Sequence, residues 1–444
     1  MHTPRRFHIL TDNTVSRIPH AARALFALLL VALSIPLPAF AQGGIPADNP
    51  AVRRGLDDIK SFNAWTLEQQ VSICEIPAPS FKEKVRGAEF RKRLAALGYA
   101  NARVDSIGNV IAERAGSGTG PTVMIAGHLD TVFPEGTNVK VAKNGDRFDA
   151  PGIGDDCRGL TVVLVVAKAL NEGGVRTNGR VILVGDVGEE GAGNLRGVRH
   201  LLTGEYKGKV DYFISVDGLG IHVTDRAVGS NRYKVRFTGP GGHSYAAFGM
   251  PSAIHAMGRA IANISDVQVP IAPKTTFNVG VVTGGTSVNS IAGEAAMDVD
   301  MRSEALESLE RVDAAIHKAV ADALAAENAR WPKSPAKISV RFDTIGIRPL
   351  PRTPQTDDSP IVRAALDAAN ALGARVPLTG AGSTDSNIPM NLGIPAITIG
   401  GGGTGGNAHA LGEWYQDGAD GYKGPQWALL IVAALAGVVR GVTP

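Results

Sequence analysis

Apolar positions follow two different spacings along the first half of the chain. Some segments place apolar residues three or four apart, as on one face of a helix; they are residues 62–74, 81–97 and 160–170. Short apolar runs rich in β-branched residues, typical of buried strands, cover residues 122–126, 180–184 and 212–216. Strands that alternate with helices in this way predict a parallel sheet covered by helices.

The pattern changes over residues 227–348. Four strand-like segments occur there, at 233–237, 276–282, 295–301 and 338–342, interleaved with helical segments at 252–262 and 306–326. The order strand–helix–strand–strand–helix–strand is that of a ferredoxin-like module. After the proline-rich residues 349–354 the α/β pattern returns, with a helix at 361–372, a strand at 396–399 and a last helix from Gln426. We therefore predict an α/β domain, residues 42–226 and 349–444, with an α+β domain of residues 227–348 inserted into it.

The first 41 residues have the pattern of a secretory signal peptide. Basic residues precede an apolar run at 24–33, and the segment ends with Ala39, Phe40 and Ala41. The run is shorter than the about 20 residues that cross a bilayer. We expect cleavage after Ala41, a periplasmic or secreted mature protein, and no stable membrane association after processing. Retention of this segment as a membrane anchor is the alternative.

Removal of the leader changes the charge balance. The whole chain has 45 Lys and Arg against 42 Asp and Glu, and residues 1–41 hold four Arg and one Asp, which leaves 41 against 41. A neutral chain without a basic stripe is not typical of nucleic-acid-binding proteins, so we expect no nucleic acid as a partner. The two cysteines, Cys74 and Cys157, allow one disulfide at most, and we expect none.

Acidic and histidine residues gather where predicted strands end. They are His128 and Asp130 after the strand at 122–126, Asp155 and Asp156 before the helix at 160–170, Glu189 and Glu190 after the strand at 180–184, Asp217 after the strand at 212–216, and His409 near the C-terminus. Ligands of open α/β sheets bind at the carboxyl ends of strands. Each acidic pair alone is more simply a solvated turn, but adjacent carboxylates in this number indicate a compensating cation. Asp130 is placed to orient the imidazole of His128.

As a set, these motifs resemble the M20 family of metallopeptidases, the co-catalytic zinc amino- and carboxypeptidases and deacylases. The motifs Gly-His-Leu-Asp-Thr at 127–131, Gly-Asp-Asp-x-x-Gly at 154–159 and Gly-Glu-Glu-Gly at 188–191 occur in the family's order, followed by Asp217 and Ala-His-Ala at 408–410. The resemblance covers nearly the whole mature chain. It implies a catalytic α/β domain of the di-zinc exopeptidase type with an inserted lid and dimerisation domain.

The resemblance also implies a cofactor and ligand roles. Two Zn²⁺ ions, with Co²⁺ or Mn²⁺ as alternatives, would be held by His128, Asp155 and Asp217 and by Asp155, Glu190 and His409, with Asp155 as the bridge. Glu189 would move the proton of the attacking water. Family members have a cis peptide bond after the bridging residue, here between Asp155 and Asp156. Cys157 stands where Lys or Met is frequent, and we expect it to pack rather than to bind zinc.

Further roles follow from the resemblance for the lid and for the last third of the chain. His243 would reach across a dimer interface and stabilise the oxyanion in the partner's site, which implies a homodimer through the lid. Asn289 and Arg302 would hold polar groups of the substrate, Arg302 through a carboxylate. Ser383 would lie before a helix whose amides bind a substrate carboxylate. Glu413 is a contact of the site or a plain surface acid.

The predicted function is hydrolysis of amide bonds in short peptides or acylated amino acids. Family members with Asp at the position of Asp217 tend to be aminopeptidases or dipeptidases, so that type is favoured. A carboxypeptidase or an N-acyl amino acid deacylase is the alternative. An inactive peptide-binding protein is disfavoured because Glu189 and all five ligand residues are present.

Overall fold

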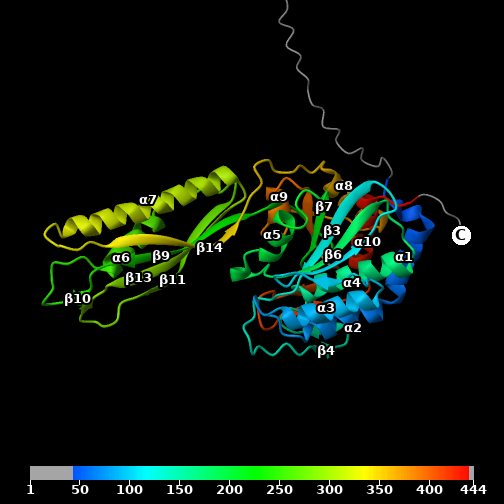
Figure 1. The fold of residues 1–444 in the computed structure, drawn as a ribbon, viewed down its shortest axis with the longest axis horizontal. Coiled ribbons are helices and arrows are strands. Elements are labelled where there is room, and N and C mark those ends of the chain that lie inside the picture. The colour runs from blue at the N-terminus through cyan, green and yellow to red at the C-terminus, as the bar shows by residue number, and fades with distance from the viewer. Residues whose placement is uncertain (1–43, 440–444) are drawn as a thin grey trace, which may run out of the picture. The chain divides into compact units, whose positions relative to one another are not determined.

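The computed structural model describes residues 44–439, and the predicted signal peptide lies outside them. Its largest element is an eight-stranded sheet with the order β1-β2-β6-β3-β7-β16-β8-β15 (Figure 1). In that order the strands are β1 (Arg103–Val104), β2 (Val110–Arg114), β6 (Gly179–Asp186), β3 (Gly120–His128), β7 (Tyr212–Val216), β16 (Ala396–Ile399), β8 (Val223–Ala227) and β15 (Leu378–Gly382). Strands β6, β3, β7 and β16 are parallel, so their carboxyl ends share one edge of the sheet.

Helices cover both faces of this sheet because its strands are apolar on both sides. Val123 and Ile125 of β3 belong to the core formed with α4 and α10, whereas Met124 and Ala126 face a second core with α5. The helices of this part are α1 (Pro50–Ser61), α2 (Asn63–Cys74), α3 (Lys84–Ala96), α4 (Cys157–Glu172), α5 (Arg196–Thr203), α8 (Pro360–Ala371), α9 (Asn387–Asn391) and α10 (Lys423–Ala436).

The apolar C-terminal helix α10 is a core helix, as expected. Trp427 is fully buried, and its indole N–H donates to the carbonyl of Ala365 at 2.8 Å. Within residues 44–439, no helix combines the length and the apolar character needed to cross a bilayer.

The inserted module is a four-stranded antiparallel sheet with the order β11-β13-β9-β14. Its strands are β9 (Gly229–Thr238), β11 (Thr275–Gly284), β13 (Glu294–Ser303) and β14 (Ser339–Arg348), and its helices are α6 (Ala253–Ser265) and α7 (Leu306–Arg330). Val235 and Phe237 pack with the helices, while the alternate residues of β9, including Arg232 and Arg236, lie on the opposite face of the sheet. The predicted ferredoxin-like order is confirmed.

One sheet near the site was not predicted from the sequence. A small sheet, β17 (Thr404–Gly406), β18 (Trp414–Gln416), β5 (Arg147–Asp149) and β4 (Ala142–Asn144), joins the segment around His409 to the segment before Asp155. Ser383 lies before the five-residue helix α9, which begins at Asn387. In the turn between them, the side chain of Asn387 accepts from the backbone N–H of Thr384 at 3.0 Å.

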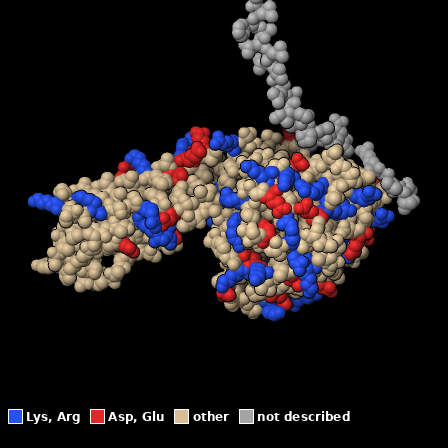
Figure 2. Space-filling view, in the orientation of Figure 1, with Lys and Arg blue, Asp and Glu red and all other residues tan. Residues whose placement is uncertain are grey.

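The surface of the described residues mixes both charges. On the face shown in Figure 2, Lys and Arg side chains alternate with Asp and Glu side chains. Charges of both signs are therefore mixed on this face instead of forming a patch of one sign.

Candidate metal centre and active-site cavity

The sheet edge brings the acidic and histidine motifs together. His128 is the last residue of β3, Asp217 follows β7, and Glu189 and Glu190 follow β6 after a tight turn. Gly188 makes that turn with φ of 70°, a left-handed conformation that favours glycine. The sequence motifs therefore converge because parallel strands end on one side.

Asp155 lies between two sets of nitrogen and oxygen atoms. Its Oδ1 is 3.0 Å from Nε2 of His128, and its Oδ2 is 3.0 Å from Nε2 of His409. His409 Nε2 is also 3.0 Å from Oε1 of Glu190. The candidate ligand atoms of His128, Asp155 and Asp217 lie within 4.8 Å of one another, as do those of Asp155, Glu190 and His409. All five predicted ligands thus meet, with Asp155 common to both groups.

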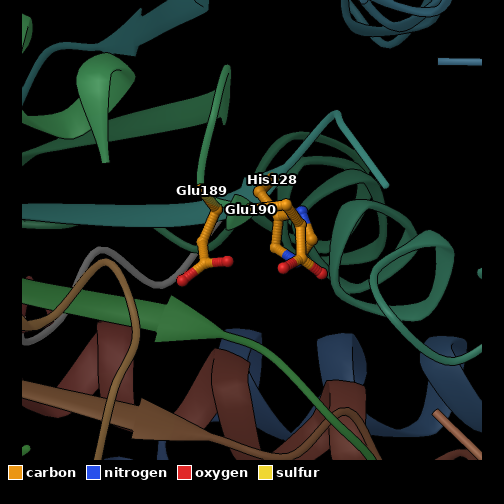
Figure 3. A group of neighbouring side chains, drawn as sticks. All are labelled: His128, Glu189 and Glu190. Atoms are coloured by element: carbon orange, nitrogen blue, oxygen red, sulfur yellow. The ribbon is translucent and has the colours of Figure 1, made fainter. Parts of the chain in front are cut away.

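Glu189 and Glu190 are adjacent but point differently. Figure 3 shows the Glu190 side chain beside His128 and the Glu189 carboxylate directed away from it. One ligand atom of each of these three residues nevertheless lies within 4.8 Å of the others. Glu189 therefore lies near the candidate metal groups but belongs to neither of the two ligand sets that contain Asp155.

Carboxylates are crowded in this site. Burial, reinforced by Asp155, raises the pKa of Glu190 to about 8. Burial and the same neighbour raise the pKa of Asp217 to about 8. The hydrogen bond to Asp155 raises the pKa of His409 to about 9. Buried like charges of this kind indicate a site built for cations, and imidazole nitrogen with carboxylate oxygen is a donor set that fits Zn²⁺.

The loop that carries Asp155 is held from both sides. The peptide bond between Asp155 and Asp156 is cis, as the resemblance implied. The Asp156 carboxylate accepts from the backbone N–H groups of His128 and Gly159, both at 2.9 Å, and so caps α4. Glu413 is buried and accepts from the backbone N–H groups of Gly152, Gly154 and Asp155 at 2.8, 2.8 and 2.9 Å.

Glu413 is therefore not a surface acid, which was one of the two readings of the sequence. Its carboxylate supports the loop of Asp155 from the segment of His409. In the sequence, Glu413 stands out only because it lies four residues after His409. That spacing does not predict that its carboxylate accepts from three backbone N–H groups.

Asp130 is fully buried behind the cavity. It accepts from the Ser80 hydroxyl at 2.6 Å and from the backbone N–H groups of Glu189 and Glu190 at 3.0 and 3.1 Å. Its carboxylate lies 3.6 Å from His128 Nδ1, and the nearer partner of that nitrogen is the Asp130 carbonyl at 3.1 Å. Asp130 thus orients both the imidazole and the turn that carries the two glutamates.

A cavity of about 660 Å³ opens beside these residues. Its lining consists of Val132, Gly154, Asp155, Glu189, Glu190, Gly191, Asp217, Gly218, Leu219, Arg232, Arg302, Arg348, Ser383, Gly405, Gly406, Ala408, His409 and Glu413. The predicted substrate residues Arg302 and Ser383 are among them.

Arg348, at the end of β14, was not singled out from the sequence. It is buried and donates to Oε1 of Glu189, to the Glu189 carbonyl at 2.6 Å and to the Ser383 carbonyl at 3.1 Å. Because β14 is the last strand of the lid sheet, this side chain ties the lid to the turn of Glu189. Arg348 belongs to none of the acidic and histidine motifs, so the sequence pattern did not indicate it.

His128 and Asp130 are buried and are not part of this lining, and the two residues predicted on the lid, His243 and Asn289, do not line the cavity either. His243 lies in β10 (Gly242–His243), which pairs with β12 (Ser290–Ile291), and Asn289 directly precedes β12. The Asn289 carbonyl accepts from the Ser244 N–H at 2.9 Å, so the two residues share one exposed end of the lid.

The cysteines are away from the cavity lining. Cys74 and Cys157 are both buried and neither is in a disulfide. Burial and the neighbouring Cys157 raise the pKa of the Cys74 thiol. Cys157 packs, as expected, and no candidate metal group within residues 44–439 includes it.

Comparison with known proteins places the chain among metallopeptidases. Residues 124–429 match the family described as "Peptidase family M20/M25/M40". The chain is 28% identical over 251 residues to carboxypeptidase G2 of Pseudomonas sp. (strain RS-16), an alignment that covers 53% of this chain and 59% of that protein. It is 28% identical over 302 residues to the uncharacterized protein YqjE of Bacillus subtilis (strain 168), with 66% and 76% covered. The alignment with the first of these relatives therefore spans about three fifths of its length.

Solved structures share the fold. Aminopeptidase PepT from Bacillus cereus superposes with a TM-score of 0.66 at 19% identity, covering 84% of this chain and 98% of that one. The Bacillus subtilis YXEP protein, described as a dinuclear metal binding peptidase from M20 family, gives 0.61 at 19% identity, with 85% and 99% covered. The predicted fold class, a catalytic α/β domain with an inserted lid, is confirmed.

Proposed function

Because the chain belongs to peptidase family M20/M25/M40, we propose that it hydrolyses amide bonds in short peptides or acylated amino acids with two divalent metal ions. The observation that carries this proposal is the position of Asp155, 3.0 Å from His128 on one side and 3.0 Å from His409 on the other. A carboxylate shared by two ligand sets is the arrangement of a two-metal site. His128 and Asp217 would complete one set, and Glu190 and His409 the other.

The protein's own side chains suit hydrolysis. Two divalent cations, when bound, would supply Lewis acidity and lower the pKa of water. Glu189 would accept a proton from the attacking water and deliver it to the leaving amine. Arg348 donates to one oxygen of Glu189, which leaves the other oxygen for the proton. The His128 Nδ1 contact with the Asp130 carbonyl directs Nε2 toward Asp155.

We further propose a homodimer formed through the lid. His243 is exposed and outside the cavity lining of its own subunit. Large apolar side chains near it are strongly exposed, namely Tyr245, Phe248 and Val288. Strand β11 lies at the edge of the lid sheet and exposes Val281 and Val282. An apolar patch beside an open strand edge favours a partner surface, and a partner's cavity would give His243 its role as an oxyanion donor.

The proposed activity is tested with purified protein loaded with Zn²⁺ or Co²⁺. Free dipeptides, N-acetylated dipeptides and N-acetyl amino acids are incubated with it, and products are identified by mass spectrometry. We expect hydrolysis that needs metal and disappears in Glu189→Gln. Binding of these compounds without turnover would show a binding protein instead and contradict the proposal.

Export is a separate proposal, based on residues 1–41 alone. Mass spectrometry of the protein from the exported fraction should show Gln42, free or cyclised, at the N-terminus. A retained leader would show membrane anchoring instead.

A further inference from the structure

The fold brings the two cysteines of the chain together. Cys74 is the last residue of α2 and Cys157 is the first residue of α4, far apart in a sequence of 444 residues that has no other cysteine. Both side chains are fully buried in the core of the catalytic domain. Each thiol is an immediate neighbour of the other. The two sulfur atoms therefore lie side by side.

One turn of the chain receives both residues. The Cys74 thiol donates to the carbonyl of Pro151 at 3.7 Å, and the Cys157 N–H donates to the carbonyl of Gly152 at 3.2 Å. The buried guanidinium of Arg86 lies near both thiols and donates to the Cys74 carbonyl at 3.3 Å. Because adjacent carbonyls accept from the two cysteines, the end of α2 and the start of α4 approach each other at this point.

The proposed hydrolysis uses neither thiol. Neither cysteine lines the active-site cavity, and no candidate metal group within the described residues 44–439 includes either one. A single buried cysteine acts as a small apolar residue. Two neighbouring thiols, however, can be joined by exchange with an external disulfide.

We propose that Cys74 and Cys157 form a disulfide in the exported protein and that this bond ties α2 to the loop of Asp155. The inference rests on the proposed export, because disulfides form and persist in oxidising compartments. It does not depend on the hydrolase function. It reverses the expectation drawn from the sequence, in which the contact between the two cysteines could not be seen.

The oxidant is a disulfide, either of a thiol–disulfide oxidoreductase or of oxidised glutathione. One cysteine attacks a sulfur of this disulfide as a thiolate and displaces one thiol, and the second cysteine then attacks the mixed disulfide and displaces the other. The protein loses two protons and two electrons, and the oxidant gains them and leaves as two thiols. Because both cysteines are fully buried in the folded chain, this exchange takes place while the chain folds.

The bond would act on the metal loop. Cys157 follows Asp156, whose carboxylate caps α4, and lies two residues after Asp155. A covalent link at the start of α4 limits the motion of this loop and also restricts the unfolded chain. We expect the disulfide form to release zinc to a chelator about 10-fold more slowly than the thiol form. We also expect its Tm to be higher by about 5 °C.

The test uses the full mature chain, refolded with zinc either in a mixture of oxidised and reduced glutathione or in a phosphine reductant. Alkylation in denaturant should label no thiol in the first preparation and two in the second. Intact mass should differ by two hydrogens before labelling, and a non-reducing digest should contain one peptide pair joined through Cys74 and Cys157. Protein from the exported fraction is analysed in the same way, followed by Tm and zinc release for both forms.

Cys74→Ala and Cys157→Ala are the matched controls, since each retains one thiol and cannot form the bond. Their Tm should be the same in the oxidising and reducing preparations, whereas the Tm of the wild-type protein should differ. This comparison separates the effect of the bond from that of packing. The thiol count and the mass are measured on the wild-type protein, so a variant that fails to fold does not affect them.

Each contrary result overturns a stated claim. Two free thiols in protein refolded under oxidising conditions, or in the exported fraction, overturn the disulfide, as does a bond between two chains. A bond within the chain that lowers Tm or speeds zinc release overturns its proposed effect on the loop. Absence of the protein from the exported fraction overturns the export proposal and this inference with it. Lack of hydrolase activity in both forms overturns the proposed function alone.

Discussion

The Glu413 carboxylate accepts a hydrogen bond of 2.9 Å from the backbone N–H of Asp155, although 258 positions separate them in the chain. The same carboxylate also accepts from Gly152 and Gly154. Glu413 follows His409 closely, so one buried side chain connects the segments of two proposed metal ligands. A charged acceptor with three donors fixes the loop far better than water could.

Replacement of Glu413 should therefore weaken metal binding without removing a ligand. Glu413→Gln keeps one oxygen but turns an amide N–H toward a backbone donor, and Glu413→Ala leaves all three donors without a partner. We expect metal affinity to fall by about 10- to 100-fold, more for Ala than for Gln. Competition with a chelator measures it, and Glu172→Gln, on the exposed end of α4, is the control. Unchanged affinity in both Glu413 variants would mean that the loop holds its shape unaided.

Glu189→Gln should separate chemistry from metal binding. The amide cannot accept the proton of water, so we expect kcat to fall by about 10²- to 10⁴-fold. Metal content measured after dialysis should remain at the wild-type value, because Glu189 is outside both ligand sets that contain Asp155. Loss of metal from this variant would contradict the proposed role as general base.

Arg348 and Glu189 form a buried ion pair whose strength can be measured by a double-mutant cycle. Both side chains are about 6% exposed. Arg348→Met leaves a buried carboxylate unpaired, and we expect it to lower the free energy of unfolding by about 3–5 kcal/mol. The double variant Arg348→Met with Glu189→Gln should recover part of that loss in denaturant unfolding of metal-free protein. Strict additivity of the two single effects would show that the pair is not coupled.

Metal-free protein should lose stability as the pH rises. Burial raises the pKa values of Glu190 and Asp217 to about 8, from ordinary values of 4.5 and 3.8. The folded state therefore holds protons that the unfolded state releases, so this stabilisation is complete below about pH 4 and is lost as pH rises through about 8. Metal binding needs the deprotonated carboxylates, so added Zn²⁺ should raise Tm more at pH 8 than at pH 5.

Thermal unfolding with and without metal at the two pH values measures this effect. The variant Glu190→Gln with Asp217→Asn should show a smaller decrease of metal-free Tm with pH. A metal-dependent increase of Tm that is larger at pH 5 would contradict the assignment of these carboxylates as ligands.

The cross-subunit role of His243 is tested by mixing two inactive variants. In a dimer, a site needs its own Glu189 and the partner's His243, so a hybrid of Glu189→Gln and His243→Ala subunits has one complete site. Random re-association of equal amounts should restore about a quarter of the wild-type activity. Sedimentation of each variant verifies the dimer. No recovery from a confirmed mixed dimer would place His243 outside the partner's site.

Much of the fold could be predicted from the local pattern of apolar residues along the chain. The strand Tyr212–Val216 and the strand Ala396–Ile399 occupy the residues predicted from apolar runs. The order of strands and helices in the lid could be predicted because the apolar residues of each segment recur with a clear period. By contrast, α1, with Pro50 at its start, and the strands β2, β8 and β15 toward the two sides of the sheet were not predicted, since short or mixed segments acquire their structure from neighbours.

The sequence by itself determined which residues can bind metal and on which edge of the sheet they lie. Motif residues that follow parallel strands must meet at the carboxyl edge, so His128, Asp217 and Glu190 could be grouped without coordinates. Only the tertiary structure decided which charges are already paired. Arg348 with Glu189, Glu413 with the Asp155 loop, and Asp300 with Arg232 join residues from distant segments or facing strands. Hydrogen bonds act over about 3 Å, and the sequence does not specify distances between segments on that scale.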